Sequence, residues 1–121
     1  LKGEREALRA FGDYVADPRL RRATERALQV AVEICLDIGR RIIAREGFRF
    51  PENNQEVFRV LAQEDVIPAS LLPTLEKMAR FRNLIVHDYA RIDDATVYGI
   101  LTKRVDDFAR FAEAVQEHLA R

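Results

Sequence analysis

The chain has 121 residues, with 20 Lys and Arg against 20 Asp and Glu, so its formal net charge is zero when both His are neutral. This balance argues against a surface that is cationic all over, as most nucleic-acid binders have, and a single Cys excludes a disulfide within the chain. Five Gly and four Pro leave little material for a turn-rich β fold, so the composition favours helices.

The sequence shows no segment that would lie in a membrane. No apolar run approaches the roughly 18 to 20 residues that span a bilayer, and the start of the chain is too charged for a signal peptide. We therefore expect a cytoplasmic protein. We find no internal repeat and expect residues 1–121 to form a single domain. With one Cys and two His, we expect neither a metal site nor another cofactor.

Two helices are predicted in the first part of the chain. Residues 4–15 predict a short helix, and because the chain opens without Met or a capping residue, we expect its beginning to be truncated. Apolar residues recur at steps of three and four over residues 19–45, which predicts a long amphipathic helix. Asp17 supplies an N-cap, Pro18 suits the first turn and Gly47 supplies a stop. The predicted apolar stripe consists of Leu20, Ala23, Ala27, Leu28, Val30, Ala31, Ile34, Cys35, Ile38 and Ile42.

The middle of the chain predicts a loop followed by two further helices. Residues 48–53 contain Pro and Asn and indicate the loop, after which Asn53 or Asn54 caps a short helix. Residues 69–89 again show helical periodicity. Pro73 is compatible with this helix only if it lies in the first turn.

The last predicted helix begins after Asp93 or Asp94, either of which can serve as its N-cap. Its apolar stripe runs from Val97 through Val105 to Leu119. In total, five helices with short connections predict an all-α, up-and-down helical bundle.

Chemically active side chains crowd into residues 80–91, at the end of the helix predicted over 69–89. They are Arg80, Arg82, Asn83, His87, Asp88, Tyr89 and Arg91. An imidazole can exchange a proton near neutral pH and a guanidinium can neutralise a phosphate. The arginines also form a local positive excess in a chain that is neutral overall. The second histidine, His118, is expected to lie in solvent near the C-terminus.

Helical geometry limits this interpretation. Arg82 and His87 point roughly 140° apart on a regular helix, so they converge only if the helix bends or ends between them, or if the arginine wraps around it. Cleavage of RNA without a metal normally needs both a base and an acid. A two-fold dimer would supply two copies of His87. The alternative is that these residues form a structural network of charges.

The segment RNLIVHDYA, with Arg82, four residues, His87, one residue and Tyr89, resembles the signature of the HepT family of HEPN-domain toxins. Three further segments are similar to that family in order and spacing, and together they cover nearly the whole chain. They are TERALQVAVEICLDIGRRIIAREGFRFP, EVFRVLAQEDVIP and LLPTLEKMARFRN.

The resemblance implies a HEPN-like bundle that forms a homodimer and acts as a metal-independent endoribonuclease toxin, paired with a nucleotidyltransferase antitoxin of the MntA type. Arg82 would bind the scissile phosphate of the RNA, His87 would act as general acid or base, and Asn83 would support them. Tyr89 would be adenylylated by the antitoxin, which silences the toxin by placing AMP beside the catalytic pair. Asp88 stands where family members often have a small residue. It either raises the pKa of His87 or faces solvent, and we favour the latter.

Two other functions remain open from the residues. The chain could be a non-catalytic helical module that binds a nucleotidyltransferase and its nucleotide, or a dimeric scaffold in which the motif is structural. Expression without the partner gene would distinguish the non-catalytic module from a ribonuclease, because only the ribonuclease would be toxic.

Several charged residues outside the motif have an ordinary structural interpretation. Glu33 and Asp37 are expected on a solvated helix face, the alternative being that one of them holds Arg82. A group of arginines is equally compatible with an RNA-backbone contact and with surface residues paired to Glu46 or Glu52. These arginines are Arg40, Arg41, Arg45 and Arg49. Cys35 is expected to be a small buried side chain.

Overall fold

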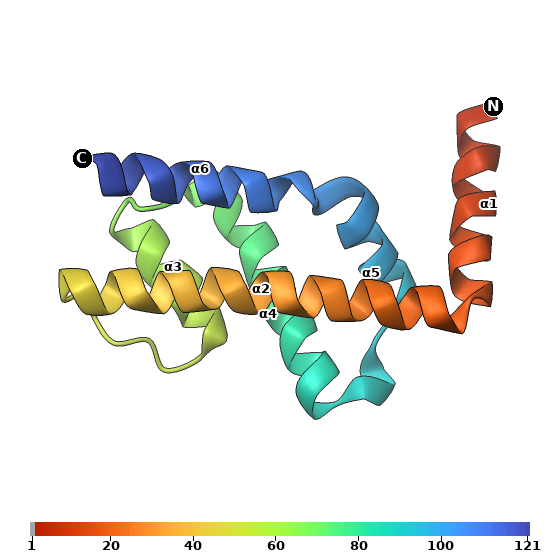
Figure 1. Ribbon diagram of the computed structural model, residues 1–121, viewed down its shortest axis with the longest axis horizontal. Helices are drawn as coiled ribbons and strands as arrows, with labels where there is room; N and C mark the ends of the chain where they lie inside the picture. The colour runs from red at the N-terminus through yellow and green to blue at the C-terminus, as the bar shows by residue number, and fades with distance from the viewer. Residues whose placement is uncertain (1) are drawn as a thin grey trace.

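The computed structural model describes the backbone of residues 2–121, and the side chains of these residues other than 2–5, 7, 8, 101 and 103. Within this range it contains six α-helices and no strand (Figure 1). The helices are α1 (Lys2–Ala16), α2 (Pro18–Glu46), α3 (Asn54–Gln63), α4 (Leu72–His87), α5 (Asp94–Gly99) and α6 (Asp106–Ala120). The predicted all-α bundle is confirmed. None of the described helices is both long enough and apolar enough to cross a membrane.

The ends of α2 follow the local signals of the sequence. The Asp17 side chain accepts a hydrogen bond from the backbone N–H of Leu20 at 3.1 Å, and Pro18 occupies the first turn. Gly47 adopts a left-handed conformation (φ 70°), and its N–H reaches the carbonyl of Ile43. A left-handed residue is easiest for glycine, because it has no Cβ to clash. These caps confirm the predicted boundaries to within a residue.

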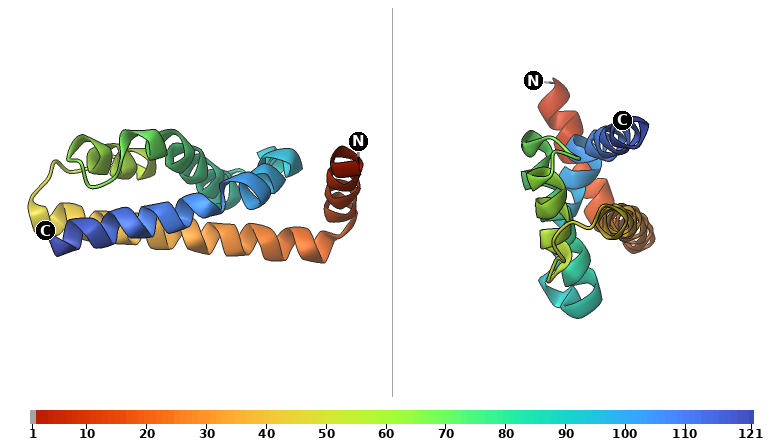
Figure 2. Two further views of the ribbon diagram at one scale, coloured as in Figure 1. Left: turned by 90° about the horizontal axis from the view of Figure 1, so that it is seen from above. Right: turned by 90° about the vertical axis from the view of Figure 1, so that its left-hand side faces the viewer.

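The bundle has two layers with the core between them. Seen from above and from one end, α2 and α6 lie side by side in one layer, and α3 and α4 form the other (Figure 2). The two layers approach closely at Gly39 of α2, where an added Cβ would lie 2.8 Å from Val57 of α3. The α1 helix turns away at one end and packs against α5, with the ring centroids of Phe11 and Tyr14 each 5.3 Å from that of Tyr98.

The prediction of one continuous helix at the end of the chain is wrong. A π-helical segment, η3 (Ile100–Arg104), separates α5 from α6, so six helices replace the expected five. A π turn holds more residues than an α turn and therefore rotates the face that follows it. As a result, the predicted stripe is interrupted and Val105 is exposed. Leu119, at the far end of the stripe, is exposed as well.

The end of α4 places the residues of the predicted motif at one edge of the molecule. A 3₁₀ turn, η1 (Ala69–Leu71), precedes α4, and Pro73 lies in its first turn as expected. The helix ends at His87, two residues earlier than predicted, because Asp88 leaves the helical conformation (φ −153°, ψ 60°). A second 3₁₀ turn, η2 (Tyr89–Arg91), follows. This end of α4 projects beyond α2 on the side opposite α6 (Figures 1 and 2).

Candidate functional site

Arg82 is held between α4 and α2 by two side chains. Its Nη2 lies 3.3 Å from Oε2 of Glu33, and its Nη1 lies 3.5 Å from Oδ1 of Asn83. The favoured expectation that Glu33 only faces solvent is therefore wrong, and the alternative that Glu33 or Asp37 holds Arg82 is confirmed for Glu33. Asp37 instead pairs with Arg41 at 3.1 Å. A guanidinium carries five N–H groups, so this arrangement leaves one on each terminal nitrogen for a further anion.

Asn83 connects this arginine to α3. Its Oδ1 also accepts a hydrogen bond from Nδ2 of Asn54 at 2.9 Å, and Oδ1 of Asn54 accepts one from Arg40. The Asn83 side chain therefore links Arg82 to Asn54 of α3. Sequence reasoning missed Asn54, which it treated only as a capping candidate. Asn53 is the cap, since its side chain accepts a hydrogen bond from the backbone of Glu56 at 2.9 Å.

His87 lies in the last turn of α4 with an exposed side chain. It lines an open pocket of about 590 Å³ together with Arg82, although the two residues point to different sides of an unbroken helix. The Arg82 side chain is long enough to reach the pocket from the other side of the helix. This is one of the ways in which the two side chains were expected to converge. The other residues of the pocket are Asn53, Asn54, Arg80, Asn83, Leu84 and Asp88. The carboxylate of Asp88 pairs with Arg91 at 3.0 Å.

Tyr89 faces a different hollow. Its hydroxyl donates a hydrogen bond to Oε2 of Glu25 at 2.7 Å, and Glu25 is only 6% exposed. This hydrogen bond raises the pKa of Tyr89 above its ordinary value. The two residues line a pocket of about 330 Å³ with Arg21 and Arg22 of α2, while the tyrosine itself is 55% exposed. The structure therefore places the Tyr89 hydroxyl next to α2 and outside the pocket that Arg82 and His87 share.

Other candidate residues have structural roles. Cys35 is buried, and burial raises the pKa of its thiol to about 11, which confirms its interpretation as a core residue. His118 was expected in solvent, but its ring is largely covered and lies 3.2 Å from Oε1 of Glu46. Arg49 pairs with Glu56 at 3.3 Å, and not with the expected Glu46 or Glu52.

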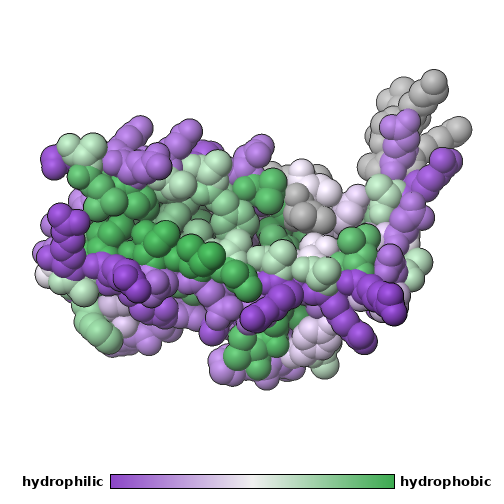
Figure 3. All heavy atoms as spheres, in the orientation of Figure 1, coloured by the Kyte–Doolittle hydropathy of each residue, from purple (hydrophilic) through white to green (hydrophobic). Residues whose placement is uncertain are grey.

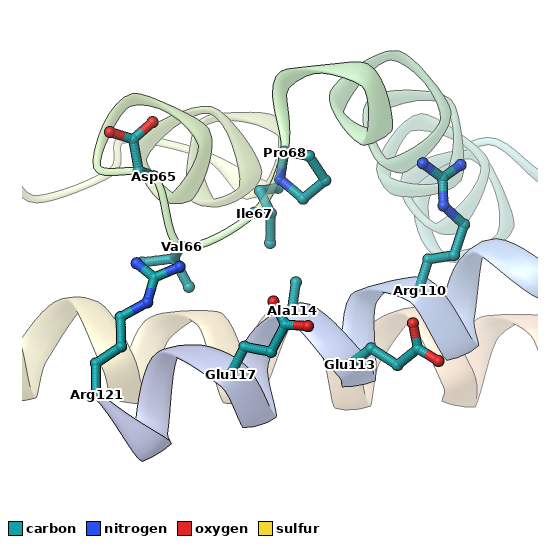
Figure 4. A pocket seen from close by; sticks show the side chains of 9 residues that line it. All are labelled: Asp65, Val66, Ile67, Pro68, Arg110, Glu113, Ala114, Glu117 and Arg121. Carbon is teal, nitrogen blue, oxygen red and sulfur yellow. The ribbon is translucent and has the colours of Figure 1, made fainter.

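Two further hollows lie on the α6 side of the molecule. One is an apolar groove of about 400 Å³ between α2 and α6, where Ile34, predicted within the stripe, is 54% exposed (Figure 3). The other separates residues 65–68 from α6, and its rim carries carboxylates and guanidinium groups around Ile67 and Ala114 (Figure 4). Neither hollow contains a histidine or any residue of the motif.

Comparisons with a family model, with known sequences and with solved structures all find HepT-like or HEPN toxin relatives. A family model described as ribonuclease HepT-like matches residues 4–115. The mRNA nuclease HepT of Shewanella oneidensis is 30% identical over 89 residues, which is 74% of this chain and 67% of that protein. The tRNA nuclease HepT of Aphanizomenon flos-aquae is 22% identical over 110 residues, covering 91% and 75% of the two chains. The structure of a tri-AMPylated HEPN toxin from S. oneidensis in complex with its MNT antitoxin superposes with a TM-score of 0.81 and 28% identity, over 86% of this chain and 78% of that one.

Proposed function

Because the chain belongs to the HepT-like ribonuclease family, we propose that it is a metal-independent endoribonuclease and the toxin of a toxin–antitoxin pair. The observation that carries this proposal is the pocket shared by the exposed His87 and the oriented guanidinium of Arg82. Relatives with the names mRNA nuclease and tRNA nuclease support RNA as the substrate class.

The side chains of the pocket suit RNA cleavage by transesterification. Arg82 binds the scissile phosphate through its two remaining terminal N–H groups, which match the spacing of two phosphate oxygens. One imidazole removes the proton of the 2′-hydroxyl, which attacks phosphorus. The bond to the 5′-oxygen then breaks as that oxygen receives a proton. The products are a 2′,3′-cyclic phosphate and a free 5′-hydroxyl, and Glu33 and Asn83 keep Arg82 in place throughout.

A homodimer supplies the second imidazole that this reaction uses. His118, the other histidine of the chain, lies against Glu46 and not in the pocket. His87 is exposed at the end of α4, so a second copy can approach it. A two-fold contact there brings two copies of His87 and Arg82 into one cleft. The end of α4 projects beyond α2 on the side opposite α6 (Figures 1 and 2), whereas the apolar groove is lined by residues of α2 and α6.

Mixing active and inactive copies tests this shared cleft. His87→Ala is expected to be inactive alone, and a heterodimer of wild type with His87→Ala keeps only one of the two imidazoles that the reaction uses. We expect subunit exchange with excess His87→Ala, after co-expression or partial denaturation and refolding, to lower wild-type RNA cleavage well below the value expected from dilution. Native mass spectrometry provides the control by showing that heterodimers form. Heterodimers that cleave RNA at about half the wild-type rate would contradict a cleft that uses both copies.

The antitoxin is proposed to be a nucleotidyltransferase that adenylylates Tyr89. The exposed ring and the motif position of Tyr89 support this site, as does the tri-AMPylated toxin among the structural neighbours. After co-expression with a nucleotidyltransferase antitoxin of the MntA type, we expect the intact mass to increase by one or more adenylyl units. This increase should disappear in Tyr89→Phe but persist in Tyr98→Phe, the matched control. An unchanged increase in Tyr89→Phe would place the modification elsewhere.

A further inference from the structure

Glu25 stands out among the buried residues of the described chain. Only Glu25 and Asp107 are buried charged side chains there, and Asp107 has a cationic partner in Arg110 at 3.2 Å. Glu25 forms no ion pair with any described residue, and its one hydrogen-bond partner is the hydroxyl of Tyr89. A buried carboxylate without a cation is costly, so its position on α2 calls for a functional reason.

Arg22 lines the same pocket as Glu25 and Tyr89, and its guanidinium is available to bind an anion. The pocket has a volume of about 330 Å³, the Arg22 side chain is exposed, and it has no ion-pair partner among the described side chains. Its neighbour Arg21 is already paired with Asp94 at 3.2 Å. The pocket thus presents a hydroxyl, a carboxylate that accepts its proton and a free guanidinium.

We propose that Glu25 and Arg22 complete an acceptor site for nucleotidyl transfer to Tyr89, in which Glu25 takes the phenolic proton and Arg22 binds the transferred phosphate. This inference rests on the proposed function and extends it to the residues that assist the modification. The donor is a nucleoside triphosphate bound to the nucleotidyltransferase. The Tyr89 oxygen forms a bond to the α-phosphorus, the bond between the α-phosphorus and the bridging oxygen breaks, and pyrophosphate leaves.

The chemistry of a phenol explains why this site needs a carboxylate. A phenol carries its proton at neutral pH, and the hydrogen bond to Glu25 raises the pKa of Tyr89 further. The proton must therefore leave while the new bond forms, and a carboxylate oxygen at 2.7 Å is within reach of it. The product is a phosphodiester with one negative charge, which a guanidinium at the mouth of the pocket stabilises.

The test follows adenylylation over time by intact mass, with the full chain, a nucleotidyltransferase antitoxin of the MntA type and ATP. At neutral pH we expect Glu25→Gln to slow the reaction by about 100-fold and Arg22→Ala to slow it by about 10-fold. Arg26→Ala is the matched control, because Arg26 is an exposed arginine one turn further along α2 that does not line the pocket. It should react at the wild-type rate.

The pH profile separates a proton acceptor from a merely structural residue. Hydroxide can replace a missing base, so the deficit of Glu25→Gln should shrink between pH about 7 and about 9.5, towards the range in which a phenol ionises. A packing defect would give the same deficit at every pH and would overturn the role of Glu25. Glu25→Asp, which keeps a carboxylate, should retain the wild-type profile at a reduced rate, and melting temperatures verify that each variant is folded.

The outcomes distinguish this inference from the function on which it rests. If the wild-type chain acquires no adenylyl group, the proposed regulation is wrong. If the wild type is modified and Glu25→Gln is modified equally fast at neutral pH, the regulation stands and Glu25 has no part in the transfer. If Arg22→Ala and Arg26→Ala slow the reaction equally, Arg22 contributes only general positive charge, and its phosphate contact is overturned.

Discussion

Replacing His87 with Ala is expected to lower the rate of RNA cleavage by about 10²–10⁴-fold, the usual contribution of a positioned acid or base. Thermal stability should change little, because the His87 side chain is exposed at the last turn of α4. The measurement is cleavage of a labelled RNA in EDTA, combined with the melting temperature of each variant. Activity that resists EDTA and depends on His87 would support acid–base chemistry by the protein itself.

His118→Ala is the matched control for this experiment. His118 is the other histidine of the chain, and it lies against Glu46, away from the pocket of His87. Its removal should leave the cleavage rate within about two-fold of wild type, with a small loss of stability from the lost surface pair. If His87→Ala cleaved RNA as fast as this control, His87 would have no role in the mechanism. The non-catalytic module would then become the better explanation.

The helices and their ends could be predicted because their signals are local. Asp17, Pro18, Gly47 and Asn53 each act within a few residues of their own position, and helical periodicity repeats within a single element. The break between α5 and α6 had no such signal. The five residues Ile100–Arg104 include no Gly or Pro that would mark a departure from α-helical geometry.

The contacts that orient the motif could not be assigned from the sequence, because they join residues far apart along the chain; a contact of Arg82 with Glu33 or Asp37 was only an alternative there. Arg82 meets Glu33 across 49 residues, and Tyr89 meets Glu25 across 64. Periodicity assigns a residue to the apolar or polar side of its helix, but it does not fix which neighbouring helix a residue at the border faces. Glu25 and Glu33 both lie on α2, and base rates place such carboxylates in solvent. The early end of α4 turns Tyr89 towards Glu25.

Replacing Arg82 is the second change with a large expected effect. Arg82→Ala should reduce RNA cleavage by about 10²–10³-fold, because it removes the group that stabilises charge on the phosphate. Arg82→Lys should recover only a small part of this loss. A lysine supplies the charge, but it cannot contact Glu33, Asn83 and two phosphate oxygens with one planar group. Arg41→Ala removes an equally charged side chain from a surface ion pair with Asp37 and should leave cleavage unchanged.

A double-mutant cycle between Arg82 and Glu33 tests how the arginine is positioned. Glu33→Gln alone should lower cleavage by about ten-fold, because the guanidinium loses its ion pair at 3.3 Å and samples other orientations. In an Arg82→Ala background the same substitution should have no further effect, since Glu33 acts only through the arginine. Equal effects of Glu33→Gln in both backgrounds would show instead that Glu33 contacts the RNA or the imidazole directly. The ion pair would then be incidental to catalysis.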